Sequence, residues 1–256
     1  MIKLVIRYWD ALLAKTRQSY FKMFMQKETQ SHISMFHNVI DDNEEKQPFE
    51  CRISELKEYV SHCQTVGIRF VHMDELLSSK GHAHMNYAVI TFDDGYVSVY
   101  EKVFPFMKKW GIPFTVYVTT SFVGQDGYLS REQLKELSKE PLCEVGMHAH
   151  EHLMFRYEND DKLKSDFEQC KKDIYKTAGK LPKHYAFPYG SLYAVSRKNC
   201  RIVKELGVSS IVLTQGMKLR KKDIKKPWNM PRLNIPGYYD GTVPKKERGL
   251  EIGIDD

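Results

Sequence analysis

The sequence predicts an α/β protein in which parallel βα units close into a barrel. Short apolar runs alternate with amphipathic stretches along the chain, a pattern typical of parallel βα units. Polar clusters follow several of these runs, and chemistry-bearing residues on separate strand ends favour a barrel over an open sheet. With 256 residues and 42% hydrophobic content, the chain can form one barrel-sized domain. We expect an N-terminal amphipathic segment at 1–30, the barrel domain at 31–240 and a C-terminal tail at 241–256.

Strands are expected where short runs are rich in apolar, β-branched or aromatic residues. In chain order they are 33–39, 68–72, 87–92, 114–119, 143–147, 185–187 and 209–213. The run 87–92 is apolar on both faces at its start, as expected for a strand of a parallel sheet that is covered on both sides.

Helices are expected between these strands, at 54–67, 74–77, 100–110, 130–138, 160–179 and 196–207. The helix starts carry N-terminal signals: Asp74 is expected to cap the short second helix, and Ser130 opens the fourth. Glycines mark the ends, because Gly67 stops the first helix and Gly179 stops the fifth.

Two adjacent carboxylates, Asp93 and Asp94, follow the strand 87–92, and Gly95 permits a sharp turn just beyond them. Successive strand residues point to opposite sides, so these two carboxylates cannot do the same job in the same direction. We interpret one as a metal ligand and the other as a proton acceptor.

Three histidines crowd the segment after the strand 143–147. If the chain turns or becomes helical at His148, then His148 and His152 share one face, and His150 points elsewhere. If the strand instead continues, all three histidines share a face, and a His-x-His pair becomes the ligand set. We favour the first arrangement. Imidazoles and one carboxylate suit zinc or a neighbouring first-row metal.

Composition argues against several classes of function. The formal charge is +6, but the lysines are scattered and no compact arginine and aromatic motif for nucleic acid is present. Five cysteines form no Cys-x-x-Cys pair, which favours a reducing compartment. Arg7 and Asp10 interrupt what would be the apolar region of a secretory signal, and the same stretch is too short to cross a bilayer. We therefore expect a cytoplasmic protein.

The first 25 residues contain apolar side chains at helical spacing, with most basic residues on other faces. Such a helix is expected either to pack across the barrel or to attach weakly to an anionic membrane surface, at the inner face. The sequence does not indicate an oligomeric state.

The Asp-Asp segment resembles the first motif of a known family, the polysaccharide deacetylases of the NodB-homology type, carbohydrate esterase family 4. The resemblance extends over roughly 33–236. It implies a distorted (β/α) barrel of the NodB-homology type, with 31–240 as its catalytic domain. Segment 91–95 carries this motif, which implies that Asp93 is the catalytic base and Asp94 a metal ligand.

The other two motifs of the family also have counterparts. Segment 146–152 resembles the second motif, which implies that His148 and His152 complete the metal site. Segment 186–190 resembles the third motif, which implies that the backbone amide of Tyr189 helps to bind the oxyanion.

The chain also departs from the family pattern. Ala149 replaces the hydroxyl residue usual after the first histidine, Ala186 replaces the arginine that orients the catalytic aspartate, and Gln215 replaces the histidine that acts as general acid. A subgroup that acts on N-acetylglucosamine polymers resembles this chain at 36–39 and 230–234, and it too lacks the motif arginine. We predict that Arg232 orients the catalytic aspartate instead.

The leaving amine needs a proton that Gln215 cannot supply, and the alternatives are His37, His150 or protonated Asp93. The resemblance implies a metal-dependent N-deacetylase of an acetylated amino sugar or glycan, with Zn²⁺ as the expected metal and Co²⁺, Ni²⁺ or Fe²⁺ as alternatives. Two other functions stay open: a sugar-binding pseudoenzyme, because of the losses at 186 and 215, and a barrel amidase or deformylase acting on a non-sugar amide.

Overall fold

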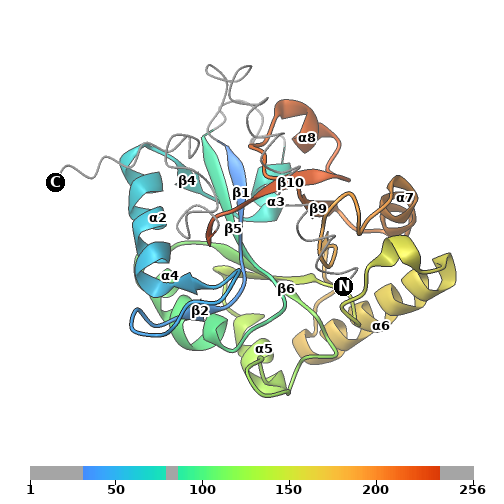
Figure 1. Cartoon of the computed structure of the whole chain (residues 1–256), viewed down its shortest axis with the longest axis horizontal. Coiled ribbons are helices and arrows are strands. Elements are labelled where there is room, and N and C mark those ends of the chain that lie inside the picture. The colour runs from blue at the N-terminus through green and yellow to red at the C-terminus, as the bar shows by residue number, and fades with distance from the viewer. Residues whose placement is uncertain (1–30, 79–85, 237–256) are drawn as a thin grey trace.

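A computed structural model describes residues 31–78 and 86–236, and Figure 1 shows this part as a central group of strands with helices around it. The amphipathic segment predicted at 1–30 and the tail at 241–256 lie outside the described residues. The domain boundaries and the membrane contact therefore stay predictions. Within the described part, no helix is both long and apolar enough to span a bilayer.

Seven parallel strands form the barrel. They are β1 (His32–Phe36), β5 (Tyr87–Phe92), β6 (Phe114–Val118), β7 (Cys143–Met147), β8 (His184–Ala186), β9 (Ser210–Thr214) and β10 (Met230–Asn234). Strands β5 to β10 pair in parallel in chain order, and β1 pairs with both β10 and β5, which closes the ring. The (β/α) barrel predicted from the sequence is therefore confirmed. A short strand, β4 (Arg69–Phe70), pairs with the start of β5, and β2 (Val39–Ile40) pairs with β3 (Cys51–Arg52) apart from the barrel.

Helices cover the outside of the ring (Figure 1). They are α2 (Ile53–Thr65), α4 (Phe104–Trp110), which continues from a π-helical turn at Val99–Val103, α5 (Arg131–Leu137), α6 (Asp160–Ala178) and α7 (Arg197–Glu205). Two short helices, α3 (Met73–Leu77) and α8 (Lys221–Lys225), pack on each other at the N-terminal ends of the strands. A 3₁₀ turn, Phe155–Tyr157, precedes α6.

Alternation along β5 separates the outer core from the barrel interior. Ala88, Ile90 and Phe92 pack outward with the helices, whereas Val89 packs inside the ring. The inner cluster is apolar and extends to α3 and α8 at the N-terminal ends of the strands, which form the base of the barrel. It comprises Ile33, Val71, Met73, Leu76, Val89, Tyr117, Ala186, Val212, Leu219, Ile224 and Met230. Burial of one Val, Leu, Ile or Met side chain of this cluster stabilises the fold by about 1.5–3 kcal/mol. The middle of the barrel is therefore filled mainly with apolar side chains.

Several elements differ from those expected. The strand predicted at 33–39 ends at Phe36, because the backbone N–H of Val39 donates to the Ser98 hydroxyl (3.0 Å) rather than to a barrel strand. The helix predicted at 100–110 begins with the π-helical turn. Strand β10 and helix α8 were not predicted; Pro231, which cannot donate a backbone hydrogen bond, weighs against a strand in β10.

Asp74 does not cap α3, contrary to the sequence-based expectation. The helix begins at Met73, and His72 at its N-cap makes no side-chain capping bond. The carboxylate of Glu144, at the start of β7, instead accepts the backbone N–H groups of Met73 (2.9 Å) and Asp74 (3.3 Å). A residue distant in sequence thus satisfies the helix start, which local patterns cannot reveal.

Candidate metal centre and active site

The residues that the sequence singles out follow separate strands of the barrel. They are His37 after β1, Asp93 and Asp94 after β5, His148 and His152 after β7, Tyr189 after β8, and Arg232 within β10. The strands are parallel, so their C-terminal ends form one rim, and side chains from different strands meet there.

Asp94, His148 and His152 bring three ligand atoms together at this rim. Oδ1 of Asp94 lies 3.3 Å from Nε2 of His148 and 3.3 Å from Nε2 of His152. A tetrahedral ion with bonds of about 2.0–2.1 Å holds its ligand atoms about 3.3–3.4 Å apart. Oδ1 of Asp94 is also buried without a well-formed hydrogen bond. The cluster therefore has the donor types, the spacing and the unsatisfied oxygen that fit one divalent cation.

The neighbours of His148 determine which of its ring nitrogens faces the candidate metal site. Its Nδ1 lies 2.8 Å from the carbonyl oxygen of Ala186, which can only accept a hydrogen bond, so Nδ1 carries a hydrogen and Nε2 is the nitrogen turned toward the centre. Burial lowers the pKa of His148, but the carboxylates of Asp93 and Asp94 raise it by a larger amount, so the net pKa is above the usual value. This negative surrounding also favours a bound cation.

The pKa of Asp94 is held well below its usual range. Burial raises this pKa, but the neighbouring imidazoles of His148 and His152 lower it by more. The carboxylate is therefore ionised at neutral pH and available as an anionic ligand.

The segment that joins the two histidines is a turn and not a helix. Strand β7 ends at Met147, and Ala149 has φ of 69°, in the left-handed region. The prediction allowed either a turn or a helix at His148. The helix is wrong, and the chain turns there instead. His150 points away, with Nδ1 2.9 Å from the Thr120 hydroxyl and 3.3 Å from Oδ2 of Asp173. The His-x-His alternative is not the arrangement present.

Asp93 lies inside the barrel and is paired with Arg232. The two guanidinium nitrogens donate to the two carboxylate oxygens at 2.6 Å each, and both side chains are buried. Nη1 of Arg232 also donates to the hydroxyl of Thr91 (3.1 Å). Burial raises the pKa of Asp93, but Arg232 and His148 lower it by more, so the net pKa is below the usual value. Arg232 thus makes the pairing with Asp93 that the sequence predicted for it and that Ala186 cannot make.

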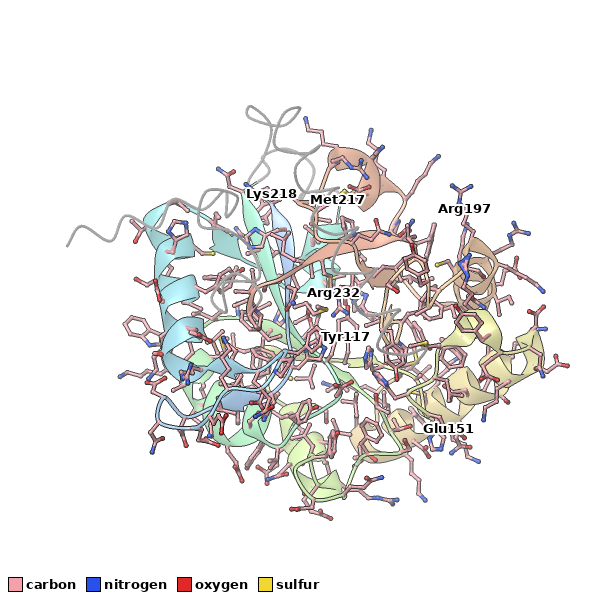
Figure 2. The ribbon with its side chains drawn as sticks, viewed as in Figure 1. Tyr117, Glu151, Arg197, Met217, Lys218 and Arg232 are labelled. Atoms are coloured by element: carbon pink, nitrogen blue, oxygen red, sulfur yellow. The ribbon has the colours of Figure 1, made fainter. Side chains whose placement is uncertain are left out.

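The ring of Tyr117 packs against the guanidinium of this pair. The Arg232 guanidinium lies 5.6 Å from the centre of the Tyr117 ring, a cation–π distance, and Figure 2 shows both side chains near the middle of the molecule. A side chain at Gly146 would meet the Tyr117 ring at 2.6 Å, so only glycine fits there. Tyr117 was not among the predicted site residues, since an aromatic residue in a strand looks like ordinary core.

Tyr189 lies beside the metal residues on a strained turn. Its ring centre is 4.6 Å from that of His152, and its φ is 61°. The next residue, Gly190, packs so closely on Thr214 that a Cβ would lie 2.6 Å from the hydroxyl oxygen. This close approach holds the Tyr189 backbone at the rim. Its role with the oxyanion stays a prediction.

His37 also faces this centre. Its Nδ1 is buried without a hydrogen-bond partner, and its ring lies 5.6 Å from that of Phe49. Burial lowers the pKa of His37 more than the charges of Asp94 and Asp93 raise it. Gln215, in contrast, donates to Oδ1 of Asn229 (2.5 Å). Of the proton donors considered, His37 and Asp93 lie at the centre.

A second cluster of similar residues lies at the opposite end of the barrel. It consists of Asp74, Glu144 and His184, whose ligand atoms also approach one another. Here the groups have other partners: Lys183 forms an ion pair with Asp74, the α3 amides donate to Glu144, and Nδ1 of His184 lies 2.8 Å from the Ser210 hydroxyl. These contacts tie α3 to the barrel base.

The chain belongs to the polysaccharide deacetylase family, whose model matches residues 80–211, slightly more than half of the chain. This agrees with the barrel and with the Asp-His-His cluster at its rim. Deacetylases of this family are metalloenzymes, and the cluster is a candidate site for their metal.

Relatives and solved structures agree with this assignment. A poly-beta-1,6-N-acetyl-D-glucosamine N-deacetylase of Staphylococcus aureus (strain MRSA252) is 27% identical over 205 residues, 73% of this chain and 66% of that protein. The enzyme of the same name from Staphylococcus epidermidis is 26% identical over 234 residues, 84% of this chain and 78% of that protein. This chain thus spans just under two thirds of the length of the S. aureus protein.

Among solved structures, IcaB from Ammonifex degensii superposes with a TM-score of 0.70 at 24% identity, covering 84% of this chain and 98% of that chain. The Streptococcus pyogenes deacetylase PplD, in complex with acetate, has a TM-score of 0.71 at 17% identity, covering 81% and 92%. At these identities the likeness shows a shared fold.

Proposed function

We propose that the protein is a metal-dependent N-deacetylase that hydrolyses the acetamide of an N-acetylated amino sugar within a glycan. One observation carries this proposal: a buried, arginine-paired carboxylate lies beside a three-residue cation site on the same rim. Oδ2 of Asp93 is 3.9 Å from Nε2 of His148, so a proton acceptor and a cation site are next to each other. Membership of the polysaccharide deacetylase family supports the same reaction.

Asp93 is the proposed general base. A bound divalent cation would supply Lewis-acid chemistry, polarising the acyl oxygen and lowering the pKa of water. Asp93 would accept the proton of the water that attacks the acetyl carbon. Its two bonds to Arg232 fix the carboxylate plane, and the depressed pKa keeps it ionised before the attack. Tyr189 would contribute its backbone N–H to the developing oxyanion.

His37 is the proposed proton donor to the leaving amine. Its partially buried imidazole faces the centre, and Nδ1 has no hydrogen-bond partner among the described residues. The lowered pKa means that His37 must take up a proton before it can donate one to the amine. Protonated Asp93 is the alternative donor, because it holds the proton taken from water. Replacing His37 with Gln separates the two: a drop in kcat supports His37, and an unchanged kcat assigns the proton to Asp93.

Zn²⁺ is the metal we propose. The contact distances of 3.3 Å suit a tetrahedral ion with two imidazoles and one carboxylate, and water or substrate would take the fourth position. Co²⁺, Ni²⁺ and Fe²⁺ accept similar ligands, so reconstitution of metal-free protein with each ion, followed by activity measurement, decides among them.

The proposed substrate is a polymer or oligomer of N-acetylglucosamine. The relatives from S. aureus and S. epidermidis are named for poly-beta-1,6-N-acetyl-D-glucosamine, and they support a β-1,6-linked substrate for this chain. The linkage preference is therefore testable against β-1,4-linked chitooligosaccharides of equal length.

Acetate release from both sets of oligomers, by the zinc-loaded protein and its Asp93→Asn variant, tests the function. We expect release that requires metal, is lost in the variant and is faster for β-1,6-linked oligomers. Metal binding without acetate release from any glycan would instead support a sugar-binding pseudoenzyme. Release from simple N-acetyl or N-formyl amides alone would support the amidase or deformylase function.

A further inference from the structure

Asp166 is a charged residue on the buried face of α6. The buried residues of this helix are otherwise apolar: Leu163, Phe167, Cys170 and Ile174. Asp166 is only 4% exposed. A carboxylate in such a position costs free energy unless it is hydrogen-bonded, so its partners indicate what it does.

Both oxygens of Asp166 accept hydrogen bonds from one short segment. Oδ1 accepts the backbone N–H of His150 (2.8 Å), and Oδ2 accepts the backbone N–H of Glu151 (2.7 Å). Burial raises the pKa of Asp166 by more than the two amide bonds lower it, so the net pKa is above the usual value. The two donors lie between the two histidines of the metal centre, and neither belongs to a ligand.

The end of β6 holds the same segment from the other side. The backbone N–H of His148 donates to the Val118 carbonyl (2.9 Å), and the N–H groups of Thr120 and Ser121 donate to the carbonyls of Ala149 (3.2 Å) and His150 (3.1 Å). The turn therefore lies between the barrel and α6. Only Asp166 secures the N–H groups of residues 150 and 151 among the contacts of the described residues.

This support is needed because the turn is strained. Ala149 has a φ of 69°, which side-chain-bearing residues rarely adopt, and such geometry persists only where the surroundings impose it. The turn reverses the chain so that Nε2 of His148 and Nε2 of His152 both lie 3.3 Å from the same oxygen of Asp94.

We propose that Asp166 is a positioning residue of the metal centre: by binding the amides of His150 and Glu151, it fixes the turn that aims His152 at the cation site. This inference rests on the proposed metal site. It predicts that loss of one amide acceptor weakens metal binding even though no ligand is changed.

Asp166→Asn tests this with little change in shape. The amide group keeps one acceptor oxygen but turns an NH₂ group toward a backbone N–H, so one of the two bonds is lost. The matched control is Asp161→Asn, the same change on the same helix at an exposed side chain. The measurements are the Co²⁺ dissociation constant and the visible absorption spectrum of each cobalt-saturated protein.

We expect Asp166→Asn to raise the Co²⁺ dissociation constant about 10–100-fold and to alter the cobalt absorption bands, because neighbours that orient metal ligands have effects of this size. The control should match the wild type in both. A purely structural role would lower the melting temperature without moving the spectrum. A dissociation constant within twofold of wild type, with the same spectrum, would overturn the proposal.

The wild-type protein provides a second test that does not depend on whether the variant folds. Amide hydrogen exchange of the metal-free protein should show slow exchange at His150 and Glu151, and exchange as fast as in an exposed loop would overturn the proposal. Failure of the wild type to bind Co²⁺ would remove the metal site, and with it the proposed function. Normal wild-type binding with an unaffected Asp166→Asn variant would overturn the positioning role alone.

Discussion

The two ends of the barrel each carry carboxylates close to histidines, and they differ in the hydrogen-bond and ion-pair partners of these carboxylates. At the base, Glu144 accepts the amides of α3 and the hydroxyl of Thr115 (3.2 Å), and Asp74 is paired with Lys183. At the rim, the neighbours of Oδ1 of Asp94 within the described ranges are the imidazole nitrogens of His148 and His152. The same residue types therefore do not imply the same function at both ends. At the N-terminal end of the barrel, donors within the protein already satisfy the carboxylates.

Backbone strain separates the two ends in the same way. Four non-glycine residues of the described part have positive φ: Phe49, Asp94, Ala149 and Tyr189. Three of them belong to the rim motifs, and none belongs to the base cluster. Strain of about 1–3 kcal/mol per residue persists where the surrounding structure imposes it, which is typical of functional sites. At the rim, the strained residues hold the candidate metal ligands in place, whereas the groups at the base of the barrel hold helix α3.

The largest effect should come from Asp93→Asn. The amide cannot accept the proton of water, so we expect acetate release to fall by about 10²–10⁴-fold, the range that a general base contributes. Because Asp93 does not contribute to the ligand triad, zinc content should stay near one per chain by elemental analysis. Loss of the metal would show that Asp93 is a ligand and not the base.

Arg232→Lys should have the next largest effect. A compact ammonium group cannot reproduce the two parallel bonds to Asp93, so the carboxylate loses its fixed orientation. We expect kcat to fall on the order of 10²-fold, as misplacement of a reacting group does, with KM and zinc content changed much less. Steady-state kinetics measure this. Full activity in Arg232→Ala would show that the residue is not involved.

Glu144→Gln probes the base and should affect stability rather than catalysis. The amide retains one acceptor, so part of the capping of α3 is lost, and we expect a loss of about 1–2 kcal/mol in the free energy of unfolding. Urea denaturation measures this loss, and kcat of the folded variant should match the wild type. A variant that lost zinc or activity while staying folded would indicate that the cluster at the base of the barrel also takes part in function.

The smallest effect concerns the response of the base to acid. His184, beside Asp74, and Lys183 hold the pKa of this carboxyl below its usual range, against the effect of burial. A depressed carboxyl pKa stabilises the fold above the unfolded value of about 3.9, and the contribution disappears as pH falls through the folded value. Asp74 is nearly half exposed, which limits the contribution to about 1 kcal/mol at most.

Asp74→Asn should therefore reduce the loss of stability between about pH 4 and pH 2, and leave the pH dependence above that window unchanged. Denaturation series at several pH values measure this slope. An identical slope in wild type and variant would mean that Asp74 has the same pKa in the folded and unfolded states.

The barrel and the rim motifs could be predicted because their signals are local. Apolar runs located β5 and β6, Gly179 at φ of 69° ends α6 as expected, and the Asp and His clusters follow their strands directly. In the same way, the vacancy at Ala186 pointed to Arg232, which the structure places against Asp93.

What could not be predicted depends on contacts between distant residues. Strand β10 contains Pro231, which weighs against a strand locally, yet the strand closes the barrel between β9 and β1. Asp166 looks like a helix surface residue until α6 is placed against the histidine turn. The Asp74 prediction failed for the same reason, because Glu144 lies 70 residues away.

The location of bound zinc tests the contrast between the two ends most directly. Crystals grown with Zn²⁺ and measured at the zinc absorption edge should give one anomalous peak, bonded to Asp94, His148 and His152. We expect none between Asp74, Glu144 and His184, because Lys183 already pairs with Asp74 and the amides of α3 already donate to Glu144. A peak at the base with no metal at the rim, or coordination by His150 in place of His152, would contradict this interpretation.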